Sequence, residues 1–84
     1  MSDTLRIDHQ PEHLCFVALV KGQEARLEYQ LLPRGGIDFT YTFVPETLRG
    51  HGIAEKLVRT GLAWAREQGY VIEASCWYVR RFLR

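Results

Sequence analysis

One segment of this sequence has the periodicity of a long amphipathic helix, and this feature most restricts the possible folds. Its apolar residues recur at three- and four-residue intervals and form a wide stripe: Ile53, Ala54, Leu57, Val58, Gly61, Leu62 and Ala65. The opposite face is charged, and Glu55 and Arg59 form a favourably ordered pair four residues apart. Gly69 is expected to end the helix after Gln68. The rest of the 84-residue chain must then bury this stripe.

Three segments before the helix have the patterns of β-strands. Residues 14–20 are mostly apolar, which predicts a strand buried on both faces. Residues 25–31 alternate between apolar and polar side chains, which predicts a half-buried strand. The Pro-Arg-Gly-Gly run at 33–36 predicts a turn. Residues 37–44 alternate again, which predicts one shared face for Ile37, Phe39, Tyr41 and Phe43.

Two shorter elements are expected after the helix. Residues 70–75 are predicted to form a fourth strand, and residues 77–83 a terminal helical turn or two. A strand–helix–strand crossover makes strands 37–44 and 70–75 parallel, with a right-handed connection. The predicted fold is therefore α+β: a mixed, twisted four-stranded sheet with one long helix and a short C-terminal helix. Because a chain this short can build only one core, residues 1–84 are expected to form a single domain.

Charge and composition restrict the partners of the chain. Eleven basic and ten acidic residues leave a net charge of +1, which favours neither nucleic acid nor an anionic membrane. Residues 1–6 lack the apolar core of a secretory signal, and no apolar run approaches the ~20 residues that span a bilayer. The two cysteines do not form a disulfide framework. We therefore expect a cytoplasmic monomer or weak homodimer with no nucleic-acid or membrane partner.

The segment between the third strand and the helix has the composition of a phosphate-binding loop. A helix N-terminus presents unpaired N–H groups and the positive end of the helix dipole. Gly50 and Gly52 would let the backbone approach a pyrophosphate, Ala54 keeps the first turn small, and Arg49 can add a charge-assisted contact. A Walker loop is excluded because no Gly-Lys-Ser or Gly-Lys-Thr occurs. The G-x-G-x-A spacing also departs from the G-x-G-x-x-G dinucleotide fingerprint.

The run Arg-Gly-His-Gly-Ile-Ala at 49–54 resembles the acetyl-CoA loop of the GNAT superfamily of N-acetyltransferases, (Arg/Gln)-x-x-Gly-x-(Gly/Ala). The resemblance covers nearly the whole chain and continues through Val44-Pro45-Glu46, Leu57-Val58, Ala63-Trp64-Ala65, Gly69 and Ser75-Cys76. It implies transfer of acetyl from acetyl-CoA to an amine or thiol of a small molecule or protein. A CoA or acyl-CoA binding module without catalysis is the alternative. An interaction or nucleic-acid-binding domain is a third hypothesis.

The resemblance also assigns roles to individual positions of the loop. Backbone amides would hold the CoA pyrophosphate at Gly50, His51, Gly52, Ile53 and Ala54. Backbone groups around Phe43 and Val44 would pair with the pantetheine arm. His51 occupies a variable position where Gln, Arg or Lys is usual. Trp77 replaces the small residue or proline that commonly follows the cysteine, which could narrow the acceptor site.

Cys76 is the candidate catalytic residue, either as a nucleophile that takes the acetyl group or as a thiol that protonates the departing CoA thiolate. The alternative is an inert cysteine that fills space. Tyr78 is a candidate general acid and Glu73 a candidate base, although packing and surface roles are the simpler interpretations.

Two other groups of residues have the side chains of possible binding sites, one for a metal ion and one for RNA. No metal site is expected at His9, His13 and Cys15, because Pro11 prevents the histidines from sharing a helical face. The aromatic and basic tail at 77–84 is predicted to be an amphipathic helix that closes the core, not an RNA-binding segment. Its arginines are candidates for a contact with the 3′-phosphate of CoA.

Overall fold

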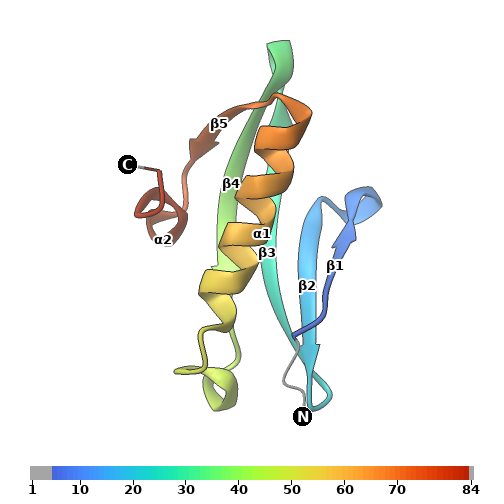
Figure 1. Ribbon diagram of the computed structural model, residues 1–84, viewed down its shortest axis with the longest axis vertical. Coiled ribbons are helices and arrows are strands. Elements are labelled where there is room, and N and C mark those ends of the chain that lie inside the picture. Colours follow the sequence, from blue (N-terminus) through green and yellow to red (C-terminus); the bar gives the residue numbers. More distant parts are fainter. Residues whose placement is uncertain (1–4, 84) are drawn as a thin grey trace.

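The computed structural model describes residues 5–83 and shows a five-stranded sheet with the long helix α1 across one face (Figure 1). The strands are β1 (Ile7–Gln10), β2 (Cys15–Val20), β3 (Gln23–Leu32), β4 (Gly36–Phe43) and β5 (Val71–Ala74). The helices are α1 (Ile53–Gln68) and α2 (Trp77–Arg80), with 3₁₀ turns η1 (Pro11–His13), η2 (Pro33–Gly35) and η3 (Glu46–Leu48). The strand order is β1–β2–β3–β4–β5, and only β4 and β5 are parallel.

The predicted α+β class, the mixed sheet and the β4–α1–β5 crossover are confirmed, but the predicted count of four strands is wrong. The additional strand is β1, which pairs with β2 from Ile7↔Ala18 to Gln10↔Cys15. His9 anchors it: its ring stacks on Phe16 at 4.1 Å, and its Nε2 lies 2.7 Å from the Tyr29 hydroxyl. Burial lowers the pKa of His9, so the neutral imidazole is favoured there. The run at 7–10 is mostly polar and gave no strand signal, because the contacts that stabilise β1 are made with residues of other strands.

Helix α1 begins after Gly52 and ends at Gly69, and both glycines have the left-handed backbone (φ 74° and 80°). The end predicted at Gly69 is therefore confirmed, since only glycine adopts this conformation without strain. The predicted stripe faces the sheet, with the following helix residues buried: Ile53, Leu57, Val58, Gly61, Leu62 and Ala65. Among residues 5–83, no helix is long and apolar enough to cross a membrane. The prediction that residues 1–6 do not form a secretory signal falls mostly on residues outside the described range.

The predicted face of the third strand is correct only as far as Phe39. The pairing of β3 with β4 changes register between Glu28 and Tyr29, because Tyr29 pairs with Phe39 whereas Glu28 pairs with Tyr41. Thr40 is therefore an extra residue, and a bulge of this kind turns the residues that follow it to the opposite face. Tyr41 is 50% exposed, whereas Phe39 is fully buried. The prediction that Tyr41 and Phe43 share the face of Ile37 and Phe39 is wrong for this reason.

The helix and the sheet approach each other closely at Gly61. A Cβ atom on Gly61 would lie 2.7 Å from Leu27 Cδ2 and 3.2 Å from Phe39 Cε1. Both neighbours are fully buried, so little free space is available for them to move into. The glycine thus sets the distance between the two layers.

Gly61→Val is expected to lower the free energy of unfolding by roughly 1–3 kcal/mol, because overpacking forces neighbouring side chains off their rotamers. Urea unfolding followed by circular dichroism measures this. Ala63→Val is the control, since Ala63 is exposed on the same helix, and we expect it to cost well under about 1 kcal/mol through helix propensity. Equal losses in the two variants would contradict the close approach.

Candidate functional site

The loop between β4 and α1 leaves the first amides of the helix without partners. Its glycines have positive φ, 87° at Gly50 and 74° at Gly52, and no side chain of the described residues caps Gly52. The first helical hydrogen bond runs from the amide of Lys56 to the carbonyl of Gly52 at 3.1 Å. Within residues 5–83, no acceptor is found for the amides of Ile53, Ala54 or Glu55. Unpaired N–H groups at the positive end of a 16-residue helix favour an anion.

A hollow of about 180 Å³ opens beside these amides, and we call it the loop hollow. It is lined by Val44, Leu48, Arg49, Gly50, Gly52, Ile53, Ala54, Glu55 and Tyr78. A Cβ atom on Gly50 or Gly52 would meet no atom within 4 Å, so the space above the loop backbone is open. Most of the predicted loop residues therefore share one cavity.

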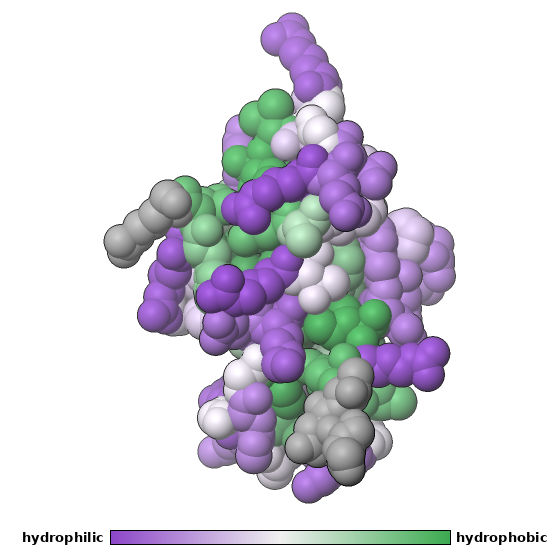
Figure 2. All heavy atoms as spheres, in the orientation of Figure 1, coloured by the Kyte–Doolittle hydropathy of each residue, from purple (hydrophilic) through white to green (hydrophobic). Residues whose placement is uncertain are grey.

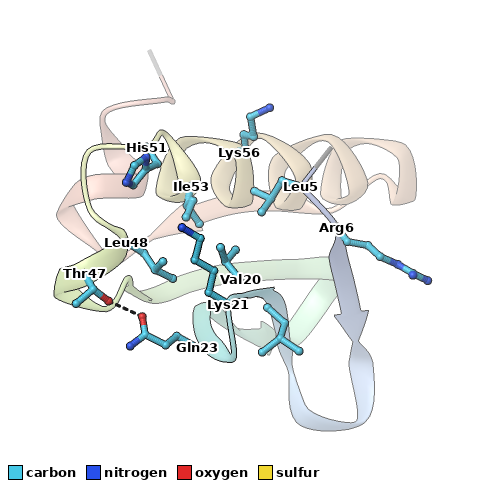
Figure 3. A pocket seen from close by; sticks show the side chains of 11 residues that line it. Leu5, Arg6, Val20, Lys21, Gln23, Thr47, Leu48, His51, Ile53 and Lys56 are labelled. Atoms are coloured by element: carbon cyan, nitrogen blue, oxygen red, sulfur yellow. Dashed lines mark hydrogen bonds between the residues drawn. The ribbon is translucent and has the colours of Figure 1, made fainter. Parts of the chain in front are cut away.

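Arg49 and His51 differ from the other predicted loop residues, although Arg49 also lines the loop hollow. Arg49 donates from Nε to the carbonyl of Val44 at 3.1 Å, so it ties the two ends of the loop together. His51 lines a second hollow of about 980 Å³, which we call the basic groove (Figure 3). The basic groove is lined by Leu5, Arg6, Leu19, Val20, Lys21, Gln23, Thr47, Leu48, His51, Ile53 and Lys56.

Strand β4 loses its neighbour on one side near the middle of the sheet. Its parallel pairing with β5 runs from Gly36↔Val71 to Phe39↔Ala74. The amide of Cys76 then donates to the carbonyl of Phe39 at 3.0 Å, and the chain turns away into α2. Beyond Phe39, β4 pairs only with β3 among the described residues. Its backbone at 40–43 therefore lacks a second strand neighbour, and the groups of this edge that do not bond Cys76 can pair with an extended, amide-containing chain.

Cys76 lies where the two strands separate, and it is half-buried. Burial alone would raise its pKa, but hydrogen bonds lower the pKa below the usual 9.0. These come from the Thr42 hydroxyl, with Oγ1 and Sγ 3.5 Å apart, and from backbone groups of Val79, Tyr78 and Thr42. In contrast, burial raises the pKa of Cys15, which is 3% exposed. The two thiols are therefore chemically distinct.

The neighbouring candidates contribute in different ways. Tyr78 packs edge-on against Phe82, with ring centroids 5.3 Å apart, and also lines the loop hollow. Glu73 is exposed on β5, in register with Asp38. The Asp38 carboxylate accepts hydrogen bonds from the Ser75 amide and hydroxyl, both at 2.7 Å. This contact fixes the chain immediately before Cys76.

Thr42 contacts the Cys76 thiol but was not among the predicted site residues. The strand alternation offered no signal for this, because Thr42 faces the thiol through the bulge at Thr40. The histidine and cysteine near the N-terminus have other contacts: His9 bonds Tyr29, and Cys15 Sγ lies 3.9 Å from Gln10 Oε1. No group of three or more potential metal ligands occurs in the part of the chain that the structure describes.

Comparisons with known proteins agree with this fold. The sequence model of the GCN5-related N-acetyl-transferase family matches residues 15–84. Protein NATD1 of Danio rerio is 28% identical over 86 residues, which span 100% of this chain and 78% of the relative. Protein NATD1 of Homo sapiens is 27% identical over 82 residues, which span 95% and 73%. The NMR structure of a GCN5-like protein from Staphylococcus aureus superimposes with a TM-score of 0.73 at 25% identity, covering 98% of this chain and 80% of that one.

Fold and sequence thus define the class as N-acetyltransferase-like. The chain belongs to the GCN5-related N-acetyl-transferase family.

Cys76 is expected to react with iodoacetamide at a lower pH than Cys15, because the thiolate is the reactive form and only Cys76 has a lowered pKa. Alkylation rates for each cysteine, read by peptide mass spectrometry from about pH 7 to about pH 11 (roughly two units on either side of the usual thiol pKa of 9.0), give the two midpoints. Thr42→Val should raise the Cys76 midpoint, whereas Thr42→Ser should preserve it. A Cys76 midpoint at or above that of Cys15 would contradict this description of the thiol.

Proposed function

We propose that this chain is an acetyltransferase that binds acetyl-CoA along the path from the loop hollow to Cys76. One observation carries the proposal: unpaired amides, a free strand edge and a thiol of lowered pKa follow one another along this path. The loop hollow, which Tyr78 lines, lies at one end of this path, and the Thr42–Cys76 contact lies at the other end of the path. Family membership supports the reaction class.

The loop would hold the pyrophosphate through the backbone amides at Gly50, His51, Gly52, Ile53 and Ala54. The chemistry of these donors fits the group, because they are fixed N–H dipoles beside open space. Glu55 also lines the hollow, but its carboxylate is paired with Arg59 at 2.8 Å, which reduces its repulsion of an anion. Arg49 stabilises the loop shape through Val44.

The free edge of β4 would pair with the pantetheine arm, which carries two amide groups. Backbone groups near Phe43 and Val44 are available on this edge. The Val44 carbonyl already accepts a hydrogen bond from Arg49 and has a second lone pair to offer. This pairing would direct the arm toward the point where β4 and β5 separate.

Acetyl-CoA supplies an acetyl group activated as a thioester, and Cys76 is the residue of this chain that we place beside it. As a thiolate, Cys76 would attack the carbonyl carbon, form its own thioester and release the CoA thiolate. As a thiol, it would donate its proton to that thiolate while an acceptor amine or thiol takes the acetyl group, and the proton that the acceptor loses would pass to water or back to Cys76. A lowered pKa assists both roles, since it raises the thiolate fraction and makes the thiol a better acid.

Gly52→Val is expected to weaken acetyl-CoA binding by at least about tenfold, because it places a β-branched side chain beside the amides at a positive φ. Titration calorimetry measures the affinity. Gly35→Val is the matched control: Gly35 has φ 77° and equally open surroundings, but it lies in η2 at the other end of β4. We expect this variant to lose stability and keep its affinity. Undiminished binding by Gly52→Val would place the pyrophosphate elsewhere.

Incubation with acetyl-CoA is expected to add the mass of one acetyl group to the protein if Cys76 is the nucleophile. Intact-mass spectrometry detects the product, and Cys76→Ala should abolish it. Cys15→Ala is the control and should leave it unchanged, because Cys15 is buried with a raised pKa. Transfer to an acceptor amine without any acetylated protein would instead assign Cys76 the proton-donor role.

A non-catalytic CoA-binding module is the second candidate function. It is favoured by one observation: α1 covers one face of the sheet, and aromatic residues on the other face are left exposed, such as Tyr41 at 50%. The chain thus has few elements with which to shape an acceptor pocket. Such a module would bind CoA with unchanged affinity after Cys76→Ala and would show no acetyl transfer.

A further inference from the structure

The basic groove lies on the β2–β3 side of the α1 N-terminus, whereas the loop hollow lies on the side of α2. The loop separates the two hollows, and Leu48 and Ile53 line both of them. Each of these two side chains is almost fully buried, at 5% and 6% exposure. A ligand held at the loop amides could therefore extend into either hollow.

The ionisable groups that line the groove are all basic. They are Arg6, Lys21, His51 and Lys56. No carboxylate lines the groove in the described part of the chain, although the net charge of the protein is only +1. The ion pairs between side chains at 5–83 involve none of these four residues. Together with the positive end of α1, this arrangement favours an anion.

The floor of the groove is apolar. Val20, Leu48 and Ile53 contribute side chains to it, and Leu5 and Leu19 extend it. In Figure 2, hydrophobic atoms lie between the lower part of α1 and β2, bordered by hydrophilic ones. A ligand that fits this groove therefore combines a negative group with an apolar body.

We propose that the basic groove binds the 3′-phosphoadenosine end of CoA, with Lys21 as the contact of the 3′-phosphate. The proposal rests on the function proposed above. With the pyrophosphate at the loop, the pantetheine arm leaves along β4 and the nucleotide leaves into the groove, where His51 begins the wall. Figure 3 shows Lys21 reaching from the β2–β3 turn toward Ile53, whereas Arg6 points away. The adenine ring has flat aromatic faces that can pack on the apolar floor, and the phosphate is an anion that suits the basic rim.

Of the C-terminal arginines expected from the sequence to meet this phosphate, Arg84 lies outside the described residues, and Arg80 and Arg81 have other contacts. Arg80 donates to the carbonyls of Ala74 at 3.3 Å and Ser75 at 3.4 Å. The guanidinium of Arg81 lies over the rings of Trp77 and Tyr78, at 5.9 and 5.6 Å from their centroids. Lys21 has no such partner among the described side chains.

The test compares CoA with 3′-dephospho-CoA by titration calorimetry in the wild type, Lys21→Met, Lys21→Arg and Arg81→Met. The wild type should bind CoA more tightly than 3′-dephospho-CoA. Lys21→Met should weaken CoA about tenfold, as expected for loss of one charge-assisted hydrogen bond, and leave 3′-dephospho-CoA unchanged. Lys21→Arg should keep the preference because it keeps the charge. Arg81→Met removes a basic side chain on the α2 side and should change neither affinity.

Three results would overturn the placement and leave the proposed function intact: equal binding of the two ligands by the wild type, an unchanged preference in Lys21→Met, or a preference lost in Arg81→Met. Failure of the wild type to bind either ligand would overturn the proposed function as well. Circular dichroism of Lys21→Met checks that the overall fold is kept. Because Lys21 has φ 52°, the substitution could alter the β2–β3 turn, and an altered turn would weaken both ligands together.

Discussion

The packing of α1 against the centre of the sheet determines where the rest of the molecule can lie. Three fully or almost fully buried helix residues, Leu57, Val58 and Leu62, contribute to this contact, each worth roughly 1.5–3 kcal/mol of hydrophobic stabilisation. Gly61 lets the helix approach Leu27 and Phe39 closely. These contacts fix the position of the helix axis on the sheet. Because a short loop joins β4 to α1, the N-terminus of α1 then lies beside the end of β4. The position of the unpaired helix amides at the loop is therefore a consequence of core packing.

Strand β4 has two irregularities that act together. The bulge at Thr40 turns Thr42 toward Cys76 and turns Tyr41 away from the core. The loss of the β5 neighbour after Phe39 frees the edge of the same segment. Both features are needed to place Thr42 beside Cys76 at an open strand edge. Without the bulge, the same edge would present a different side chain to the thiol. The Asp38–Ser75 contact stabilises the separation by fixing the chain just before Cys76.

The predictable parts of the fold were those with local signals. The helical period between Ile53 and Ala65 and the glycine at 69 gave α1, and the order of elements gave the crossover. Strand β1 and the bulge could not be predicted, because both depend on residues distant in sequence, His9 with Phe16 and Tyr29 in one case and Thr40 with Glu28 in the other.

In the candidate site, too, the features with local sequence signals were predictable and those that join distant residues were not. The glycines of the loop were found from spacing, since positive φ and open space are local demands. The Thr42–Cys76 contact joins residues 34 positions apart and left no pattern in the sequence. The roles of the loop and of Cys76 stay predictions.

A domain of this size can form only a shallow site. One helix covers one face of the sheet, so the described chain has no second layer in which to enclose a ligand. Recognition must then be distributed along an extended molecule, through amides at a helix end, a strand edge and charges at the rim. CoA suits such a surface because its phosphates, amides and thioester are spread along its length. An acceptor would have to approach the same open molecule, where Trp77 is 68% exposed beside the proposed reacting group. Its selection would therefore depend on a few exposed aromatic side chains or on a further partner, not on an enclosed pocket.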